Sequence, residues 1–124
     1  MSSSNSSYQS LCEKSREISL LGNTAGVLGW DQETYMPSGG VEYRAKQLSW
    51  LSGKIHELGT ADDFRKALEG AEQENGADTQ SANVREIRHH FDRSTKLPRE
   101  LVEKSSVATS LGKAAWAEAR EKSD

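Results

Sequence analysis

The first residues whose type and spacing could support catalysis are His56 and Glu57. A zinc-binding His-Glu-x-x-His helix needs a second histidine four residues after the first, so that both imidazoles reach one ion while the glutamate acts on the bound water. Thr60 occupies that fourth position. Because only half of the motif is present, the sequence favours a histidine on a helix surface over a metal ligand at His56.

Other residues with reactive side chains also lack partners. His89 and His90 are adjacent, so on a helix their side chains point roughly 100° apart and cannot chelate one ion. The sequence favours one partly buried and one exposed histidine. Cys12 is the single cysteine of the chain, and a buried structural role is favoured for it over a reactive one.

Phosphate-binding and acidic motifs are equally incomplete. The glycines of Ser38-Gly39-Gly40 are not followed by the Lys-Ser/Thr of a phosphate-binding loop. The acid pairs Asp62-Asp63 and Glu72/Glu74 lie in charged stretches and are interpreted as solvated. The sequence therefore predicts no catalytic, no cofactor-binding and no metal-binding residue, and no cofactor, in this chain.

The most distinctive four residues are Trp30-Asp31-Gln32-Glu33. At the end of a helix, two carboxylates face the negative end of the helix dipole, which costs roughly 0.3–1 kcal/mol each. We therefore expect Asp31 or Glu33 to accept a bidentate guanidinium, with Trp30 packed beneath it; two exposed acids in a fraying turn are the alternative. Three arginines could supply the guanidinium: Arg44, Arg85 or Arg88.

The composition bounds the class of protein. The 124 residues suffice for one domain, and the net charge of −3 argues against a nucleic-acid partner. No segment approaches the ~18 consecutive apolar residues of a membrane span. Residues 1–7 are Ser-rich and expected to be disordered, and they lack the basic and apolar regions of a signal peptide. With one cysteine, these features predict a cytoplasmic protein.

Helical periodicity dominates residues 8–124. Apolar residues recur at steps of three, four and seven from Tyr8 to about Thr34, which predicts a long first helix. Gly22, Gly26 and Gly29 lie on a neighbouring line. Because an interior glycine costs up to ~1 kcal/mol relative to alanine, we expect another helix to approach here, with simple tolerance as the alternative. The predicted inward residues of this helix are Leu11, Ile18, Leu21, Ala25 and Leu28.

A turn at 36–40, marked by Pro37 and two glycines, separates this helix from a second one over about 41–58. Residues 60–63 resemble a capping box for a third helix, with a polar loop at 77–80 before a fourth. Pro98 suits the first turn of a fifth helix that runs to about Glu121. The predicted inward residues of these four helices are Ala45, Leu48, Leu51 or Ser52, Ile55, Leu58, Phe64, Ala67, Leu68, Ala71, Val84, Ile87, Phe91, Leu101, Ala108, Ala115, Trp116 and Ala119.

No stretch alternates as a half-buried strand does. The predicted fold is all-α, with about five helices in an antiparallel bundle or hairpin array.

Three blocks of sequence resemble, in order, the start of thermostable (Taq-type) metallocarboxypeptidases. The first is Leu28–Gly40, which continues through Gln47-Leu48; the second is Asn83–Arg88; the third is Thr95–Val102, followed by Ala115–Glu121. One departure is Ser38, which stands where a second proline is common in the family. Another is His89-His90, which fall where basic or aromatic residues are frequent.

The resemblance covers about the first quarter of such an enzyme, whose fold is related to neurolysin and angiotensin-converting enzyme. It implies zinc or another divalent metal, such as cobalt, held by residues that are missing here, so no catalytic residue is carried over. The implied partners are the remainder of the parent enzyme, peptide substrates and a possible homo-oligomer.

The chain is thus expected to be the groove-lining N-terminal domain of a metallocarboxypeptidase, inactive alone, and either a truncated chain or a split gene product. A free-standing helical module that binds other proteins without catalysis is the alternative.

Overall fold

The computed structural model describes residues 6–123, and within them all regular structure is helical. The elements are α1 (Ser7–Thr34), the short 3-10 helix η1 (Ser38–Gly40), α2 (Val41–Gly59), α3 (Asp62–Glu72), α4 (Asp78–Ser94) and α5 (Arg99–Lys122). The all-α prediction with about five helices is confirmed. Of the start predicted to be disordered, residues 1–5 lie outside the described part.

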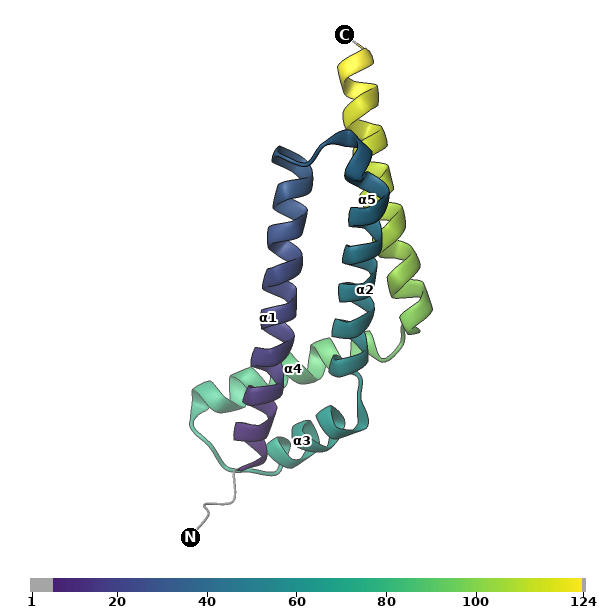
Figure 1. Ribbon diagram of the computed structural model, residues 1–124. Coiled ribbons are helices and arrows are strands. Elements are labelled where there is room, and N and C mark those ends of the chain that lie inside the picture. Colours follow the sequence, from purple (N-terminus) through teal and green to yellow (C-terminus); the bar gives the residue numbers. More distant parts are fainter. Residues whose placement is uncertain (1–5, 124) are drawn as a thin grey trace.

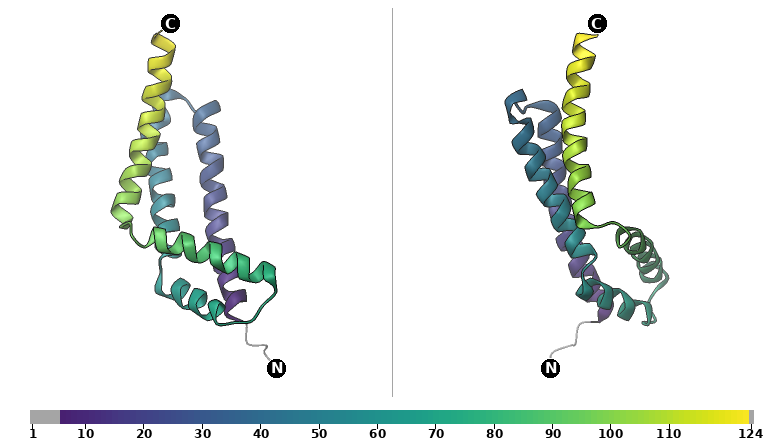
Figure 2. Two further views of the ribbon diagram at one scale, coloured as in Figure 1. Left: turned by 180° about the vertical axis from the view of Figure 1, so that it is seen from behind. Right: turned by 90° about the vertical axis from the view of Figure 1, so that its right-hand side faces the viewer.

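The helices form a long arm that rises from a short base (Figure 1). Helices α1 and α2 make an antiparallel hairpin, and α5 packs along α2 in the opposite direction. Helices α3 and α4 lie across the lower end, α4 on the side seen from behind in Figure 2. The last turns of α5 extend beyond the α1–α2 turn, so they have no neighbouring helix beside them (Figures 1 and 2).

The hydrophobic core lies at the base. Leu11 of α1 and Leu68 of α3 have no exposed surface, and the rings of Phe64 and Phe91 stack with centroids 5.9 Å apart. Burying each such side chain contributes about 1.5–3 kcal/mol. The inward residues predicted for α3 and α4 are confirmed. The buried cluster consists of Leu11, Phe64, Ala67, Leu68, Ala71, Val84 and Phe91.

The predicted inward face of α5 is wrong. Leu101 is 47% exposed and Trp116 64%, and the three alanines predicted beside them are exposed as well. The face against α2 is instead polar: Ser110 is 4% exposed, and the Ser49 hydroxyl donates to the Glu103 carbonyl at 3.2 Å. Helix α5 is therefore held against α2 by close backbone approach and hydrogen bonds. Its apolar side points away from α2.

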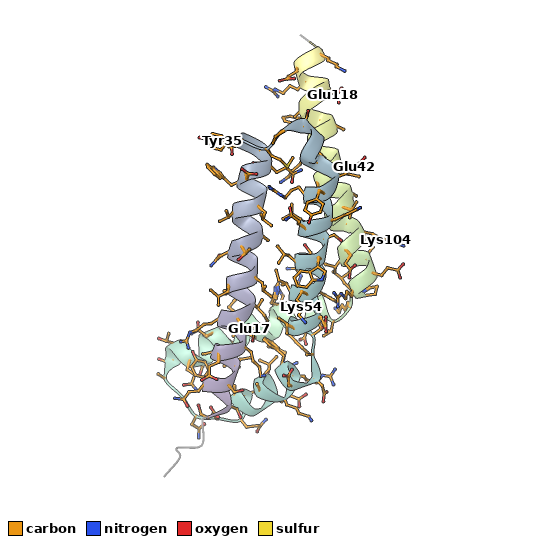
Figure 3. All side chains as sticks on the ribbon, in the orientation of Figure 1. Glu17, Tyr35, Glu42, Lys54, Lys104 and Glu118 are labelled. Atoms are coloured by element: carbon orange, nitrogen blue, oxygen red, sulfur yellow. The ribbon has the colours of Figure 1, made fainter. Side chains whose placement is uncertain are left out.

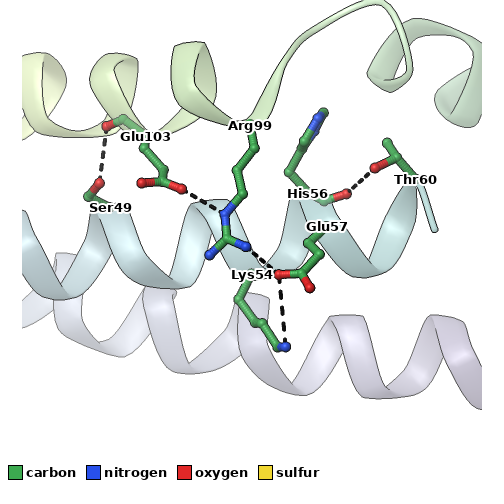
Figure 4. Close-up of polar contacts among 7 residues, drawn as sticks. All are labelled: Ser49, Lys54, His56, Glu57, Thr60, Arg99 and Glu103. Carbon is green, nitrogen blue, oxygen red and sulfur yellow. Dashed lines mark hydrogen bonds and ion pairs between the residues drawn. The ribbon is translucent and has the colours of Figure 1, made fainter.

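Gly53 permits that close approach of α2 and α5. A Cβ atom here would lie 2.6 Å from Oε1 of Glu103 and 2.9 Å from Nε of Arg99. The Nε of Arg99 donates to Oε1 of Glu103 at 2.6 Å, and its Nη1 pairs with Glu57 (Figure 4). Lys54 also approaches Glu57, at 3.9 Å. The start of α5 is therefore held on α2 by ion pairs whose side chains pack directly over the backbone of Gly53.

Three helix starts differ from the prediction. Helix α4 begins at Asp78, so the loop predicted at 77–80 is wrong for its last three residues. The capping box at residues 60–63 is wrong: Ala61 is the N-cap of α3 without a side-chain bond, and the Thr60 hydroxyl instead donates to the His56 carbonyl at 2.7 Å. A capping box that the sequence reading missed begins α1, where Ser6 is the N-cap and Gln9 its partner. Ser6 and Ser7 of the Ser-rich start therefore form the beginning of this helix.

A second side chain that accepts hydrogen bonds at the start of α1 comes from Glu74, just after the end of α3. The Glu74 carboxylate accepts the N–H groups of Ser7 and Tyr8, at 2.6 and 3.2 Å. A carboxylate at a helix N-terminus is favoured by the helix dipole, so this contact fastens the first turn of α1 to the end of α3.

Candidate functional site

His56 and Glu57 do not act together. The imidazole and the carboxylate diverge from neighbouring positions on α2 (Figure 4). Glu57 is engaged by Arg99 and Lys54, while His56 lines a cavity on another side of α2. Thr60 closes the last turn of the helix. Glu57 is therefore a structural part of the α2–α5 contact, and His56 is not.

The other candidate residues are also apart. His89 and His90 are both exposed, so the expected partly buried histidine is wrong, and Cys12 is half-buried rather than buried. Over residues 6–123, no three His, Cys, Asp or Glu side chains lie together in a way that could hold a metal ion.

The predicted contact of the Trp-Asp-Gln-Glu segment with an arginine is confirmed at Asp31. Nη2 of Arg44 lies 3.0 Å from Oδ2 of Asp31, Nη1 donates to the Leu28 carbonyl at 2.6 Å and Nε donates to Oε1 of Gln47 at 2.9 Å. Only one nitrogen reaches the carboxylate, so the pairing is not bidentate. Arg44 instead distributes its donors between the end of α1 and α2, with 14% of its side chain exposed.

Trp30 is not the floor of this contact. Its side chain is 57% exposed and meets Tyr35 edge-on, with ring centroids 5.4 Å apart. Tyr35 points away from the other helices at the end of α1 (Figure 3). Because no other helix lies over this side of α1 in the described residues, the predicted packing of Trp30 is wrong.

Two further contacts hold the end of α1 to α5. The Gln32 side-chain amide donates to the Ser110 carbonyl at 3.2 Å, and Lys113 lies 3.1 Å from Glu33. Glu33, the second acid of the segment, therefore pairs with a lysine that the sequence reading did not consider. Lys113 lies 80 residues after Glu33 in the sequence, so no local pattern indicated that the two side chains meet.

At the base, α3 and α4 are joined by a bidentate ion pair. Nε and Nη2 of Arg88 bind the two oxygens of Glu72 at 2.9 and 2.5 Å, and Nη1 binds Asp92 at 3.2 Å. The hydrogen bonds from Arg88 lower the pKa of the Glu72 carboxyl, and the same bonds raise the pKa of Arg88. Arg88 was a candidate partner for Asp31, and the structure places it here instead.

The candidate functional surface is apolar. Ten large hydrophobic side chains are exposed, including all three tryptophans. Most of them lie on the arm, on α1, α2 and α5, and exposed apolar side chains that adjoin one another are typical of a surface that another protein segment covers. The ten residues are Leu20, Val27, Trp30, Tyr35, Tyr43, Trp50, Leu97, Leu101, Leu111 and Trp116.

A cavity of about 710 Å³ opens between the arm and the base. Residues of all five α-helices and of the α4–α5 loop surround it, and His56 and His90 are among the polar residues of its wall. A cavity of this size in contact with solvent can admit several side chains of a partner. Its apolar lining consists of Ile18, Ile55, Phe64, Ile87, Phe91, Leu97 and Val102.

The glycine line of α1 is open. A Cβ atom built at Gly22, Gly26 or Gly29 would meet no atom within 4 Å. The expectation that another helix approaches these glycines is therefore wrong for the described chain, residues 6–123. The line is instead part of the exposed surface. None of the helices in these residues is long and apolar enough to cross a membrane.

Comparisons with known proteins give one family. A model described as carboxypeptidase Taq (M32) metallopeptidase matches residues 10–124. Thermostable carboxypeptidase 1 of Thermus thermophilus is 33% identical over 122 residues, 94% of this chain and 24% of that protein. The protein of the same name from Pyrococcus furiosus is 33% identical over 124 residues, 97% and 24% of the two chains.

A third relative, carboxypeptidase 1 of Bacillus subtilis, is 26% identical over 112 residues, 88% of this chain and 22% of that protein. No solved structure matches. The chain thus spans about a quarter of the length of these relatives.

Proposed function

The chain belongs to the carboxypeptidase Taq (M32) metallopeptidase family, and we propose that it forms the N-terminal helical segment of a metal-dependent carboxypeptidase. In this proposal it lines one side of the groove where the parent enzyme removes residues from the C-terminal ends of peptides. The chain alone is inactive. Its partners are the remainder of the parent enzyme and, through it, peptide substrates.

The observation that carries the proposal is the family match over residues 10–124, nearly the whole chain, against relatives of which it spans 24%. The exposed tryptophans and the open glycine line support it, because they are surfaces that a larger protein would cover. We propose that the metal ligands, for zinc or another divalent ion such as cobalt, lie outside these residues.

The first test uses the chain alone. We expect it to release no amino acid from a peptide with a free C-terminus, measured against the same peptide with an amidated C-terminus. We also expect no stoichiometric divalent metal after dialysis, because residues 6–123 offer no group of three ligands. Turnover together with tightly bound zinc would contradict the proposal.

The second test uses a chimera in which residues 1–124 replace the matched quarter of the Thermus thermophilus protein. We expect carboxypeptidase activity well above that of the same protein with the quarter deleted. A folded chimera no more active than the deleted protein would contradict the proposal. It would favour the alternative, a free-standing helical module that binds other proteins, for which the exposed aromatic residues are the supporting observation.

A further inference from the structure

One line of α1 connects the cavity with the far end of the arm. Its six residues follow one another at steps of four, three, four, three and four, and therefore share one face of the helix. The first two line the cavity, and the last one pairs with Lys113 of α5. Because its lower end borders the cavity and its upper end contacts α5, this face of α1 points toward α4 and α5. The six residues are Ser15, Ser19, Gly22, Gly26, Gly29 and Glu33.

These observations define a groove, which we call the α1–α5 groove. Its foot is the cavity of about 710 Å³, its α1 wall is the line of small residues, and its upper end is the Glu33–Lys113 ion pair. Figure 2 shows this side in its left view, with α4 crossing the foot and α1 and α5 rising from it. The foot is mainly apolar, and three positions of the α1 wall are glycines with open space in front of them.

We propose that the α1–α5 groove receives a helix from the part of the parent enzyme that residues 1–124 lack, with one or more large apolar side chains of that helix inserted into the cavity. This inference rests on the proposed function and names the face through which the segment docks. The chain spans 24% of its Thermus and Pyrococcus relatives, so about three quarters of their length is available to supply the occupant.

The surface favours a helix over an extended peptide. The backbone groups of α1 and α5 are already bonded within their own helices, so an extended peptide would find no backbone partner on either wall. A helix satisfies its own backbone groups. Helices pack at interaxial distances of 8–10 Å, and three open glycines allow the short end of that range.

A second copy of the chain is a poorer occupant. In a two-fold dimer the same surface serves both copies, so two grooves would face each other and both cavities would stay unfilled. The exposed side of α1 that carries Leu20 and Val27 is not part of the groove, since these residues lie on another face of the helix from Gly22 and Gly26. The proposal therefore predicts that, in the parent enzyme, Gly26 is covered while the neighbouring Val27 stays accessible to solvent.

The test compares cysteines at these two positions. Gly26→Cys and Val27→Cys are made in the isolated chain and in the chimera with the Thermus protein, with Cys12→Ser and every other cysteine replaced by serine. The rate of maleimide labelling is measured, and circular dichroism checks the helical content. In the isolated chain both cysteines are expected to react rapidly. In the chimera Gly26→Cys is expected to react at least tenfold more slowly, while Val27→Cys keeps its rate.

An active chimera in which both cysteines react rapidly, or both are protected, would overturn the proposal while the proposed function stands. Protection of Gly26→Cys in the isolated chain that rises with concentration would identify a second copy as the occupant and overturn it as well. If the chimera is inactive, the remaining three quarters of the Thermus protein are added to the labelled chain in trans. Slower labelling of Gly26→Cys alone then supports the docking face, and unchanged labelling rejects it.

Discussion

Glu72 and Arg88 join α3 to α4 at the base of the molecule through two parallel hydrogen bonds. Since Arg88 lowers the pKa of Glu72 below its usual 4.5, the pair stabilises the fold at neutral pH. Its contribution is lost as the pH falls through the lowered pKa of the folded state. Both side chains are about 30% exposed, which limits the effect to about 0.5–1 kcal/mol.

We therefore expect Glu72→Gln to lower the free energy of unfolding at pH 7 by about 0.5–1 kcal/mol, and the difference from the unmodified chain to shrink below pH 4.5. Urea unfolding at a series of pH values measures it. Glu69→Gln, on the same helix and exposed, is the control and should change little. An equal loss at pH 7 and pH 3 would show that the ionised pair is not responsible.

Single contacts were predictable where the two partners are close in sequence. Asp31 and Arg44 lie 13 residues apart across a proline turn, so the turn itself indicated that they meet. Glu33 pairs with Lys113 over 80 positions of sequence, and its partner depends on where α5 settles. The exposure of Trp30 was not predictable from the sequence either. A tryptophan is buried only where another element packs over it, and no element of the described residues covers Trp30.

Two glycines of the arm have opposite roles, although both lie inside helices. Gly22 of α1 faces open space, whereas a side chain at Gly53 of α2 would collide with Arg99 and Glu103. In the isolated chain, Gly22→Ala should raise the free energy of unfolding by up to ~1 kcal/mol through helix propensity. Gly53→Ala should gain nothing net, because the same propensity is offset by displacement of the Arg99 ion pairs.

Chemical denaturation of the two variants, side by side, checks this difference. Gly39→Ala is the control outside the long helices, because Gly39 lies in η1 and a Cβ atom there would also meet no other atom within 4 Å. Equal stabilisation by Gly22→Ala and Gly53→Ala would show that α2 and α5 can separate without loss, which the ion pairs of Figure 4 argue against.

Helix boundaries were more predictable than helix faces. Proline and paired glycines mark the turn between α1 and α2, and α3 has a clean apolar stripe, so these elements followed from periodicity. The face of α5 did not, because its leucines and alanines suggested burial while Ser110 and the carbonyl of Glu103 face α2. Periodicity shows which side of a helix is apolar, but it does not show whether that side is covered within the same segment.

The molecule as a whole is unevenly packed. The buried cluster lies in the base, while the arm holds only Ala45, Leu51, Gly53 and Ser110 as buried residues among those described. Hydrogen exchange should follow this distribution. We expect backbone amides around Leu68 to exchange most slowly, and those of residues 112–122 of α5 to exchange at least about a hundredfold faster.

Mass spectrometry of peptides from the exchanged chain measures this gradient. In the chimera the amides of residues 112–122 should become protected if the parent enzyme covers the arm. Uniform protection along α5 in the isolated chain would contradict the uneven distribution of the core.

The contact of Glu74 with the first turn of α1 has a consequence for the order in which the chain acquires its structure during synthesis. The Ser6–Gln9 capping box is available as soon as α1 leaves the ribosome. Glu74 follows Ser7 by 67 residues, roughly 3–13 s later at ordinary rates of translation. During that interval α1 has its apolar face uncovered and two N–H groups of its first turn unpaired. The first helix to be made is thus the one whose start is completed only after α3 has emerged. Until about 74 residues have left the ribosome, its uncovered apolar face is open to aggregation.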